Sequence, residues 1–293
     1  MITIPNITIP EKAKPYWELM RFHRPIGILL LLWPTWWALW LAAEGFPRFS
    51  VFIIFTLGVI VMRAAGCIIN DIADRNFDKH VARTDQRPLV SGALSLNQAK
   101  KALVIALAIA FFLVLFTNPL TIYLSFVAAA LACTYPFMKR YTHLPQVVLG
   151  AAFSMSIPMA FAAQTGSLDP LVIVIYVTNL LWTVVYDTFY GMTDREYDKA
   201  IGVKSTAILF EGNEQVITGS LQLLVLSGFW LIGQRFDLGM FYYLAVVIAA
   251  GLMFYHQMLI NRRQSNAYFK AFIHNHWLGL CIFLGIFLHY ALS

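Results

Sequence analysis

A chain of 293 residues with a mean hydropathy of +0.68 and only 12% charged residues lies outside the composition of soluble globular domains, in which roughly a quarter of residues are charged. This composition excludes an ordinary soluble enzyme or binding module and predicts a polytopic membrane protein. The net charge of +6 does not by itself indicate nucleic-acid binding, because in a membrane protein the position of the cations is more informative than their sum.

Nine apolar stretches of roughly twenty residues are each long enough to cross the hydrocarbon core as a helix. Turn-forming residues separate several of them, as at residues 44–48, Asn118-Pro119 and Asp169-Pro170. The predicted fold is therefore all-α, a bundle of nine transmembrane helices. In chain order, the expected spans are residues 25–43, 50–70, 102–117, 120–137, 144–163, 171–190, 215–233, 238–256 and 272–291.

The segment before the first span is polar, and we expect residues 1–24 to form a cytoplasmic N-terminal tail. The apolar run that follows is too long for the hydrophobic region of a signal peptide, so the first span is expected to remain in the mature protein. Residues 25–293 are then expected to form a single transmembrane domain. The three cysteines lack the close spacing of a metal site or redox pair and are interpreted as packing residues.

The distribution of cations predicts the orientation of the chain. With nine spans and a cytoplasmic N-terminus, 18 of the 21 lysines and arginines fall on the cytoplasmic side. Arg48 and Arg235 fall on the opposite side, and Arg63 lies inside the second span. Longer cytoplasmic loops explain part of this bias, but the positive-inside rule favours a cytoplasmic N-terminus and supports the odd number of spans.

A first acidic cluster follows the second span. Asp71, Asp74 and Asp78 stand at i, i+3 and i+7, so on a helix that leaves this span they share one face. Like charges at this spacing repel, and no cation on the same face neutralises all three. A positively charged ligand is therefore expected, and carboxylate oxygens suit a hard divalent cation such as Mg²⁺.

A second acidic cluster ends the sixth span, where Asp187, Asp194 and Asp198 stand at i, i+7 and i+11. The strings DRNFDK and DREYDK, 120 residues apart, are identical at four of six positions. This repeat predicts an internal duplication in which the second and sixth spans are counterparts that face each other across the bundle. One cluster alone could be solvated loop charge, but two at the ends of spans favour a functional site, since carboxylates at a membrane are energetically costly.

Basic residues lie close to both acidic clusters in the sequence and are able to bind phosphate oxygens directly. Magnesium held by a few carboxylates usually completes its coordination with water and substrate phosphates. Together these features indicate a diphosphate bound through magnesium at the membrane surface. A prenyl diphosphate is such a ligand, because its remaining part enters the bilayer. The candidate cations are Arg75, Lys79, Arg83, Arg87, Lys139, Arg140, Arg195 and Lys204.

The string NDIADRNFD at residues 70–78 and the segment 187–198 resemble the two aspartate-rich motifs of the UbiA superfamily of intramembrane prenyltransferases. The strings RPIGILLLLWPTWWALW, RTDQRPLVSG, YPFMKRYTHLPQ and IGVKSTAI resemble more closely its bacterial 4-hydroxybenzoate polyprenyltransferase branch. The resemblance implies a central cavity with both motifs at its cytoplasmic mouth and an opening toward lipid. It also implies a multi-pass protein of the bacterial inner membrane.

The reaction implied by the resemblance transfers a polyprenyl group, with octaprenyl expected, from its diphosphate to the ring carbon ortho to the hydroxyl of 4-hydroxybenzoate, in ubiquinone biosynthesis. The implied cofactor is Mg²⁺. The implied metal ligands are Asp71, Asp74, Asp78, Asp194 and Asp198, with Asn70 as a neutral oxygen donor. Among these we expect Asp71 and Asp194 to be essential for catalysis. Asp187, the deepest residue of the second cluster, either activates the phenol, accepts the ring proton or is a third metal ligand.

Arg63 is our first candidate for binding the carboxylate of the acceptor, with Arg24 as the second. It precedes Asp71 by eight residues, which places it about 12 Å deeper along the helix. The alternative is a structural pair with another buried polar group. Aromatic faces tolerate the allyl cation that forms when the diphosphate leaves, although for each aromatic residue individually a packing role is the favoured interpretation. The candidates are Phe77, Tyr135, Tyr186, Tyr190 and Tyr197.

Other readings remain open from the sequence. Dihydroxynaphthoate, homogentisate or haem are alternative acceptors for an enzyme of this kind. A secondary transporter is the alternative from a different class, but carriers place their substrate sites near the midplane of the membrane, whereas both acidic clusters here lie at one face. No residue pattern defines the prenyl chain length or the oligomeric state.

Overall fold

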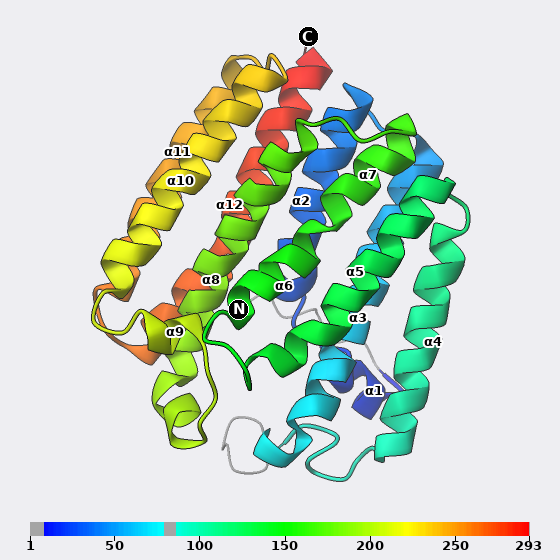
Figure 1. Ribbon diagram of the computed structural model, residues 1–293, viewed down its shortest axis with the longest axis vertical. Helices are drawn as coiled ribbons and strands as arrows, with labels where there is room; N and C mark the ends of the chain where they lie inside the picture. The colour runs from blue at the N-terminus through cyan, green and yellow to red at the C-terminus, as the bar shows by residue number, and fades with distance from the viewer. Residues whose placement is uncertain (1–8, 79–85, 293) are drawn as a thin grey trace.

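The computed structural model describes residues 9–78 and 86–292, with the side chains of residues 76–78 left out. Within these residues every regular element is a helix (Figure 1). Nine helical spans in the described part are long and apolar enough to cross a membrane. The predicted all-α fold with nine membrane-spanning helices is therefore confirmed.

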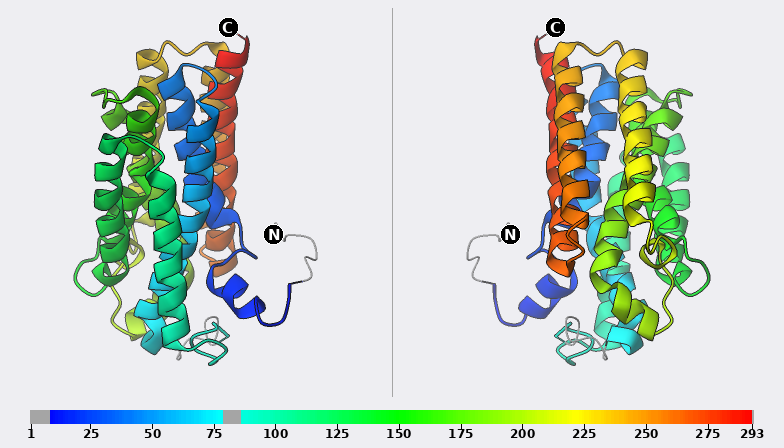
Figure 2. Two further views of the ribbon diagram at one scale, coloured as in Figure 1. Left: turned by 90° about the vertical axis from the view of Figure 1, so that its right-hand side faces the viewer. Right: turned by 90° about the vertical axis from the view of Figure 1, so that its left-hand side faces the viewer.

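The long helices run up and down in one bundle, and the C-terminus lies at the end opposite to α1 and α9 (Figures 1 and 2). Two helices outside the spans are short, α1 (Lys14–Leu19) and α9 (Thr206–Leu209). The membrane-spanning helices are α2 (Ile26–Ala43), α3 (Phe49–Asp78), α4 (Leu96–Val114), α5 (Pro119–Met138), α6 (Pro145–Ser154) with α7 (Ser156–Thr165), α8 (Val172–Ala200), α10 (Glu214–Arg235), α11 (Met240–Ile260) and α12 (Ser265–Leu292).

Helices α3 and α8 continue beyond their apolar stretches. They end at Asp78 and Ala200, whereas the apolar stretches end at residues 70 and 190. At 1.5 Å per residue, each extension adds roughly 12–15 Å of helix. Figure 1 shows both extensions at the same end of the bundle. The two acidic clusters are consequently carried on helices rather than on loops.

Helix α4 begins at Leu96, earlier than the expected residue 102, because a capping box stabilises its first turn. The side chain of Ser95 accepts a hydrogen bond from the Gln98 backbone N–H (3.3 Å), and the Gln98 side chain accepts one from the Ser95 N–H (2.8 Å). The polar residues before the apolar stretch are therefore already helical. Apolar content alone underestimates the length of this helix.

The fifth span consists of two helices, α6 and α7, which meet at Met155. Gly150 brings α6 close to α8, since a Cβ atom at this position would lie 2.9 Å from the carbonyl oxygen of Leu180. One helical turn later, the Asn179 amide donates a hydrogen bond to the Ser154 hydroxyl (2.8 Å). These two contacts fix the C-terminal half of α6 beside α8.

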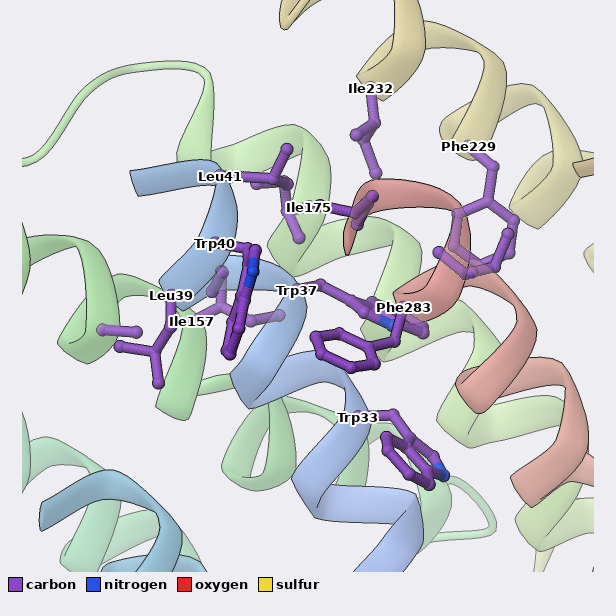
Figure 3. Packing of buried hydrophobic residues seen from close by; sticks show 14 of the residues in the cluster. Trp33, Trp37, Leu39, Trp40, Leu41, Ile157, Ile175, Phe229, Ile232 and Phe283 are labelled. Atoms are coloured by element: carbon purple, nitrogen blue, oxygen red, sulfur yellow. The ribbon is translucent and has the colours of Figure 1, made fainter. Parts of the chain in front are cut away.

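Large aromatic side chains join α2 to α12 in the core (Figure 3). The rings of three tryptophans on α2 each lie 5.1–5.9 Å from the ring of a phenylalanine on α12. The indole of Trp37 also donates a hydrogen bond to the carbonyl of Gly279 (3.0 Å). This side of the bundle is thus closed by well-packed rings. We call the group the aromatic seam; its members are Trp33, Trp36, Trp40 and Phe283.

Candidate active site

Both acidic clusters line one cavity of about 710 Å³ inside the bundle. Its walls come from α2, α3, α4, α5, α6, α7, α8 and α12, which agrees with the predicted central cavity. One end carries the carboxylates, and the deeper part is lined mainly by apolar side chains such as Leu107, Val114 and Phe153. We call the polar end the charged mouth; it is lined by Asp71, Asp74, Asp194 and Asp198.

Asp71 and Asp74 of the first cluster form ion pairs with cations from three other segments. Asp71 is only 2% exposed, and both of its carboxylate oxygens accept hydrogen bonds from the Arg21 guanidinium (2.8 and 3.1 Å). Arg87 forms a second ion pair with Asp71 at 3.2 Å. Lys139, at the end of α5, forms an ion pair with Asp74. The cations that the face of α3 itself lacks are therefore supplied by tertiary structure.

Asp187 of the second cluster lies deeper in the cavity and is positioned by α6. Its carboxylate accepts a hydrogen bond from the side chain of Gln146, whose own oxygen accepts one from the Thr206 backbone N–H (3.0 Å). Asp194 and Asp198 follow on the same helix, two and three turns closer to its end, and both line the charged mouth. The second cluster therefore extends from the mouth into the interior of the cavity.

Arg63 is half-buried and lines the deep part of the cavity. Its guanidinium lies directly against α2, because a Cβ atom at Gly27 would be 2.3 Å from Nε. The same guanidinium interacts electrostatically with Asp187 and with the phenol groups of nearby tyrosines, Tyr135, Tyr186 and Tyr190. A fixed cation and a carboxylate thus share one part of the cavity.

Most of the other predicted binding residues also line the cavity. The amide of Asn70 hydrogen-bonds the hydroxyl of Tyr135, which links α3 to α5. The side chain of Asp78 is not among those described, and Lys79 and Arg83 lie outside the described residues. The predicted residues found along the cavity wall are Arg24, Asn70, Arg87, Lys139, Tyr190 and Lys204.

Three predicted cations do not line the cavity. Arg140 donates a hydrogen bond to the backbone carbonyl of Ala73 (2.9 Å) and so joins α5 to α3. Arg75 immediately follows Asp74 on α3. Because neighbouring residues on a helix point in directions about 100° apart, the two side chains do not face the same way. Arg195 forms an ion pair with Glu214 instead.

Arg21, His23 and Gln146 line the cavity but were not predicted from the sequence. Arg21 and His23 come from the polar segment before the first span, where nothing in the sequence indicated which cation would reach the aspartates. Burial lowers the pKa of His23, and the charges of Arg24 and Arg21 lower it further, which favours the neutral imidazole. Gln146 could have been noticed as a polar residue at the start of an apolar span.

The donor atoms of the charged mouth fit a hard divalent cation. Within the described residues, no three His, Cys, Asp or Glu side chains converge on one metal position. Magnesium does not require such a cage, because it is commonly held by one or two carboxylates while substrate phosphates and water complete its octahedron. The four carboxylates of the mouth are thus suited to a metal that arrives with a phosphorylated ligand.

Comparison with known proteins places these features in context. Residues 31–284 match the model of the UbiA prenyltransferase family. The chain is 56% identical to the 4-hydroxybenzoate octaprenyltransferase of Saccharophagus degradans over 284 residues, which cover 97% of this chain and 95% of that protein.

Two solved structures share the fold. A UbiA homologue from Aeropyrum pernix K1 in its apo form has a TM-score of 0.80 at 23% sequence identity and covers 89% of this chain and 97% of its own. A UbiA homologue from Archaeoglobus fulgidus bound to GPP and Mg²⁺ has a TM-score of 0.72 at 16% identity, with 95% and 100% covered. At these identities the two structures support the fold alone.

Proposed function

Because the chain belongs to the UbiA prenyltransferase family, we propose that it transfers an octaprenyl group from its diphosphate to the ring carbon ortho to the hydroxyl of 4-hydroxybenzoate, releasing diphosphate. The observation that carries this proposal is the 56% identity, over nearly the full length of both chains, to an enzyme named for that reaction. The cavity supports it, since its charged mouth leads into an apolar interior. The reaction belongs to ubiquinone biosynthesis.

The chain is a multi-pass membrane protein. We propose that it resides in the bacterial inner membrane with its N-terminus and charged mouth in the cytoplasm. The distribution of 18 of its 21 lysines and arginines supports this orientation. The charged mouth would then take its diphosphate from the cytoplasmic side of the membrane.

We further propose Mg²⁺ as the cofactor, which is bound in the related structure from Archaeoglobus fulgidus. Asp71, Asp74, Asp194 and Asp198 would hold it, together with Asp78, whose side chain lies outside those described. When bound, the metal supplies charge neutralisation for the leaving diphosphate.

The cations of the mouth act on the same leaving group. Arg21, Arg87 and Lys139 neutralise the carboxylates of α3, and the same guanidinium and ammonium groups are placed to bind diphosphate oxygens. Donors that are already oriented toward the developing negative charge stabilise the transition state of ionisation. The allyl cation left behind is shielded from water by the cavity walls, where aromatic rings such as that of Tyr190 tolerate positive charge.

The acceptor is placed deeper in the cavity. We propose that Arg63 binds the carboxylate of 4-hydroxybenzoate, with Gly27 providing the space for its guanidinium. Asp187, held by Gln146, would accept the proton from the phenol or from the ring carbon after the new bond forms. The interaction between Arg63 and Asp187 keeps the anion-binding group and the base in one region.

Product identification tests the proposed function directly. Purified protein with Mg²⁺ would be offered 4-hydroxybenzoate, dihydroxynaphthoate and homogentisate together, with octaprenyl diphosphate as donor. We expect prenylated 4-hydroxybenzoate and an equal amount of diphosphate, measured by mass spectrometry and phosphate assay. Prenylation of another acceptor would overturn the choice of 4-hydroxybenzoate, and the absence of diphosphate release would overturn prenyl transfer itself.

A further inference from the structure

The short loop between α8 and α9 lines the cavity and is held in place at both ends. The backbone N–H of Lys204 donates a hydrogen bond to the carbonyl of Lys139 (2.9 Å), the residue whose side chain pairs with Asp74. Ser205, the last residue of the loop, is only 4% exposed and caps α9 by accepting a hydrogen bond from the Ile208 N–H (3.3 Å). The residue that follows the loop therefore has a fixed position.

That residue, Thr206, is completely buried against α8. Its hydroxyl lies 2.7 Å from the hydroxyl of Thr188. Because Thr188 donates its own proton to the carbonyl of Val184 (2.6 Å), the Thr206 hydroxyl is the donor of this pair. Helix α9 also lies close to α8, since a Cβ atom at Gly191 would be 3.1 Å from the Cβ atom of Ala207.

The position of Thr206 determines how the side-chain amide of Gln146 is oriented. The backbone N–H of Thr206 donates to Oε1 of Gln146 (3.0 Å), so the oxygen of this amide faces α9. The NH₂ group must then face the other way, and a Cβ atom at Gly191 would be 3.7 Å from Nε2. Gln146 thus presents a donor, and not its oxygen, to the carboxylate of Asp187.

A carboxylate that acts as a base needs a defined orientation. In the proposed reaction the bond from the prenyl carbon to diphosphate breaks, and the ring carbon of the acceptor bonds to the prenyl carbon. The same ring carbon then loses its proton to the base, and the electrons of the C–H bond restore the aromatic ring. The terminal torsion of an aspartate has a broad energy minimum, so a donor is needed to fix which oxygen of Asp187 faces the acceptor.

We propose that Thr206 and Gln146 are positioning residues that orient Asp187 for removal of the ring proton. This inference rests on the proposed function and identifies two residues that control its last step. Gln146 lines the cavity, whereas Thr206 does not, so Thr206 acts on Asp187 only through Gln146. The loop that carries Lys204 to the charged mouth therefore also sets the geometry of the base.

The variant Thr206→Pro removes the N–H that orients Gln146. Thr206 is the first residue of α9, a position at which helices accept proline. Ser205 has φ −155° and ψ 163°, the extended conformation that suits a residue before proline. Thr206→Val is the matched control, because it also loses the hydroxyl but retains the backbone N–H.

The ring-deuterium isotope effect is the readout. Turnover would be measured with Mg²⁺, octaprenyl diphosphate and either 4-hydroxybenzoate or its analogue deuterated at both carbons ortho to the hydroxyl. For Thr206→Pro we expect kcat to fall by roughly 10- to 100-fold, because a displaced base slows proton removal. The ratio of the light rate to the deuterated rate should rise above the wild-type value in Thr206→Pro and stay at that value in Thr206→Val.

A loss of folded protein lowers both rates equally and leaves their ratio unchanged, so the isotope ratio separates positioning from stability. A wild-type ratio in folded Thr206→Pro, or an equal rise in Thr206→Val, would overturn the proposal. If proline prevents folding, an ester in place of the amide at residue 206 removes the same N–H, retains the threonine side chain and has the same expected outcome.

A double variant tests whether Thr206 acts through Gln146. Gln146→Leu should raise the isotope ratio by itself, and adding Thr206→Pro should raise it no further. A further rise in the double variant would contradict the proposed order of contacts. The wild-type enzyme in the same assay reports on the proposed function, since a lack of prenylated 4-hydroxybenzoate there concerns prenyl transfer and not the orientation of the base.

Discussion

At the scale of single residues, Asp71 joins two other segments of the chain to α3 in the charged mouth. It is almost completely buried, and two arginines form ion pairs with it. Removing one member of a buried ion pair leaves an uncompensated charge, which is strongly destabilising. Substitution of Asp71 thus alters the positions of Arg21 and Arg87 as well as removing an oxygen donor.

We expect Asp71→Asn and Asp194→Asn each to abolish turnover with every prenyl donor, because each change removes a carboxylate proposed to hold the metal. Product formation and diphosphate release in membranes containing saturating Mg²⁺ measure this. Asp169→Asn is the control, since Asp169 is exposed in the loop before α8 and does not line the cavity. Substantial turnover by either cavity variant would contradict the assignment.

Arg63→Ala should raise KM for the aromatic acid by roughly 10- to 100-fold, since a hydrogen bond to a charged group contributes about 1.5–3 kcal/mol. KM for the prenyl donor should change little. Gly27→Ala should have a smaller effect in the same direction, because its methyl group would displace the guanidinium. Gly251→Ala is the control, with no atom within 4 Å of the new methyl group. An unchanged KM for the aromatic acid in Arg63→Ala would exclude that role.

The sequence indicated the aspartates and Arg63 because helical spacing and depth in a span can be read locally. It did not indicate that Arg21 contacts Asp71, since these residues are 50 positions apart and meet only when the N-terminal segment folds against α3. The hydrogen bond from Gln146 to Asp187 likewise depends on how α6 packs on α8. The sequence therefore allowed candidate site residues to be predicted, but not the residues that contact them.

At the scale of elements, the contact of α6 with α8 connects stability to the site. We expect Gly150→Ala to destabilise the fold by roughly 1–3 kcal/mol, because the new methyl group meets a backbone carbonyl that cannot move aside. The same shift should slow turnover by moving Gln146 away from Asp187. Thermal unfolding in detergent, with Gly251→Ala as the reference, measures the first effect. An unchanged unfolding temperature would show that α6 has room to move.

The elements were predictable to different degrees for physical reasons. Hydropathy predicted the nine spans correctly. In lipid the backbone polar groups of each span have no water to bond, so each apolar stretch must form a helix. The early start of α4 was readable from Ser95 and Gln98, which form a capping box, but an apolar window does not detect it. The break at Met155 has a local cause that an apolar window does not detect, since Pro158 has no N–H to donate to the carbonyl of Ser154, four residues earlier, where α6 ends.

At the scale of the whole molecule, the orientation in the membrane is testable by thiol labelling. In a background without Cys67, Cys133 and Cys281, a membrane-impermeant maleimide added to spheroplasts should label Ser167→Cys and not Gln264→Cys. Both positions are exposed, and they follow spans that end on opposite sides of the membrane. Permeabilised cells, in which both variants should be labelled, provide the control. The reverse pattern in intact spheroplasts would place the charged mouth on the outer face.

A cavity with one charged end and one apolar wall also affects the fate of the products. Diphosphate is a polyanion that partitions into water, and it would leave through the charged mouth. The prenylated acid partitions into the lipid phase, because its polyprenyl chain is apolar. Because the two products enter different phases, they do not meet again at the concentrations needed for recombination. The shape of the cavity would thus let each product leave into the phase in which it dissolves, which keeps products from accumulating in the site, while the equilibrium of the reaction is unchanged by the enzyme.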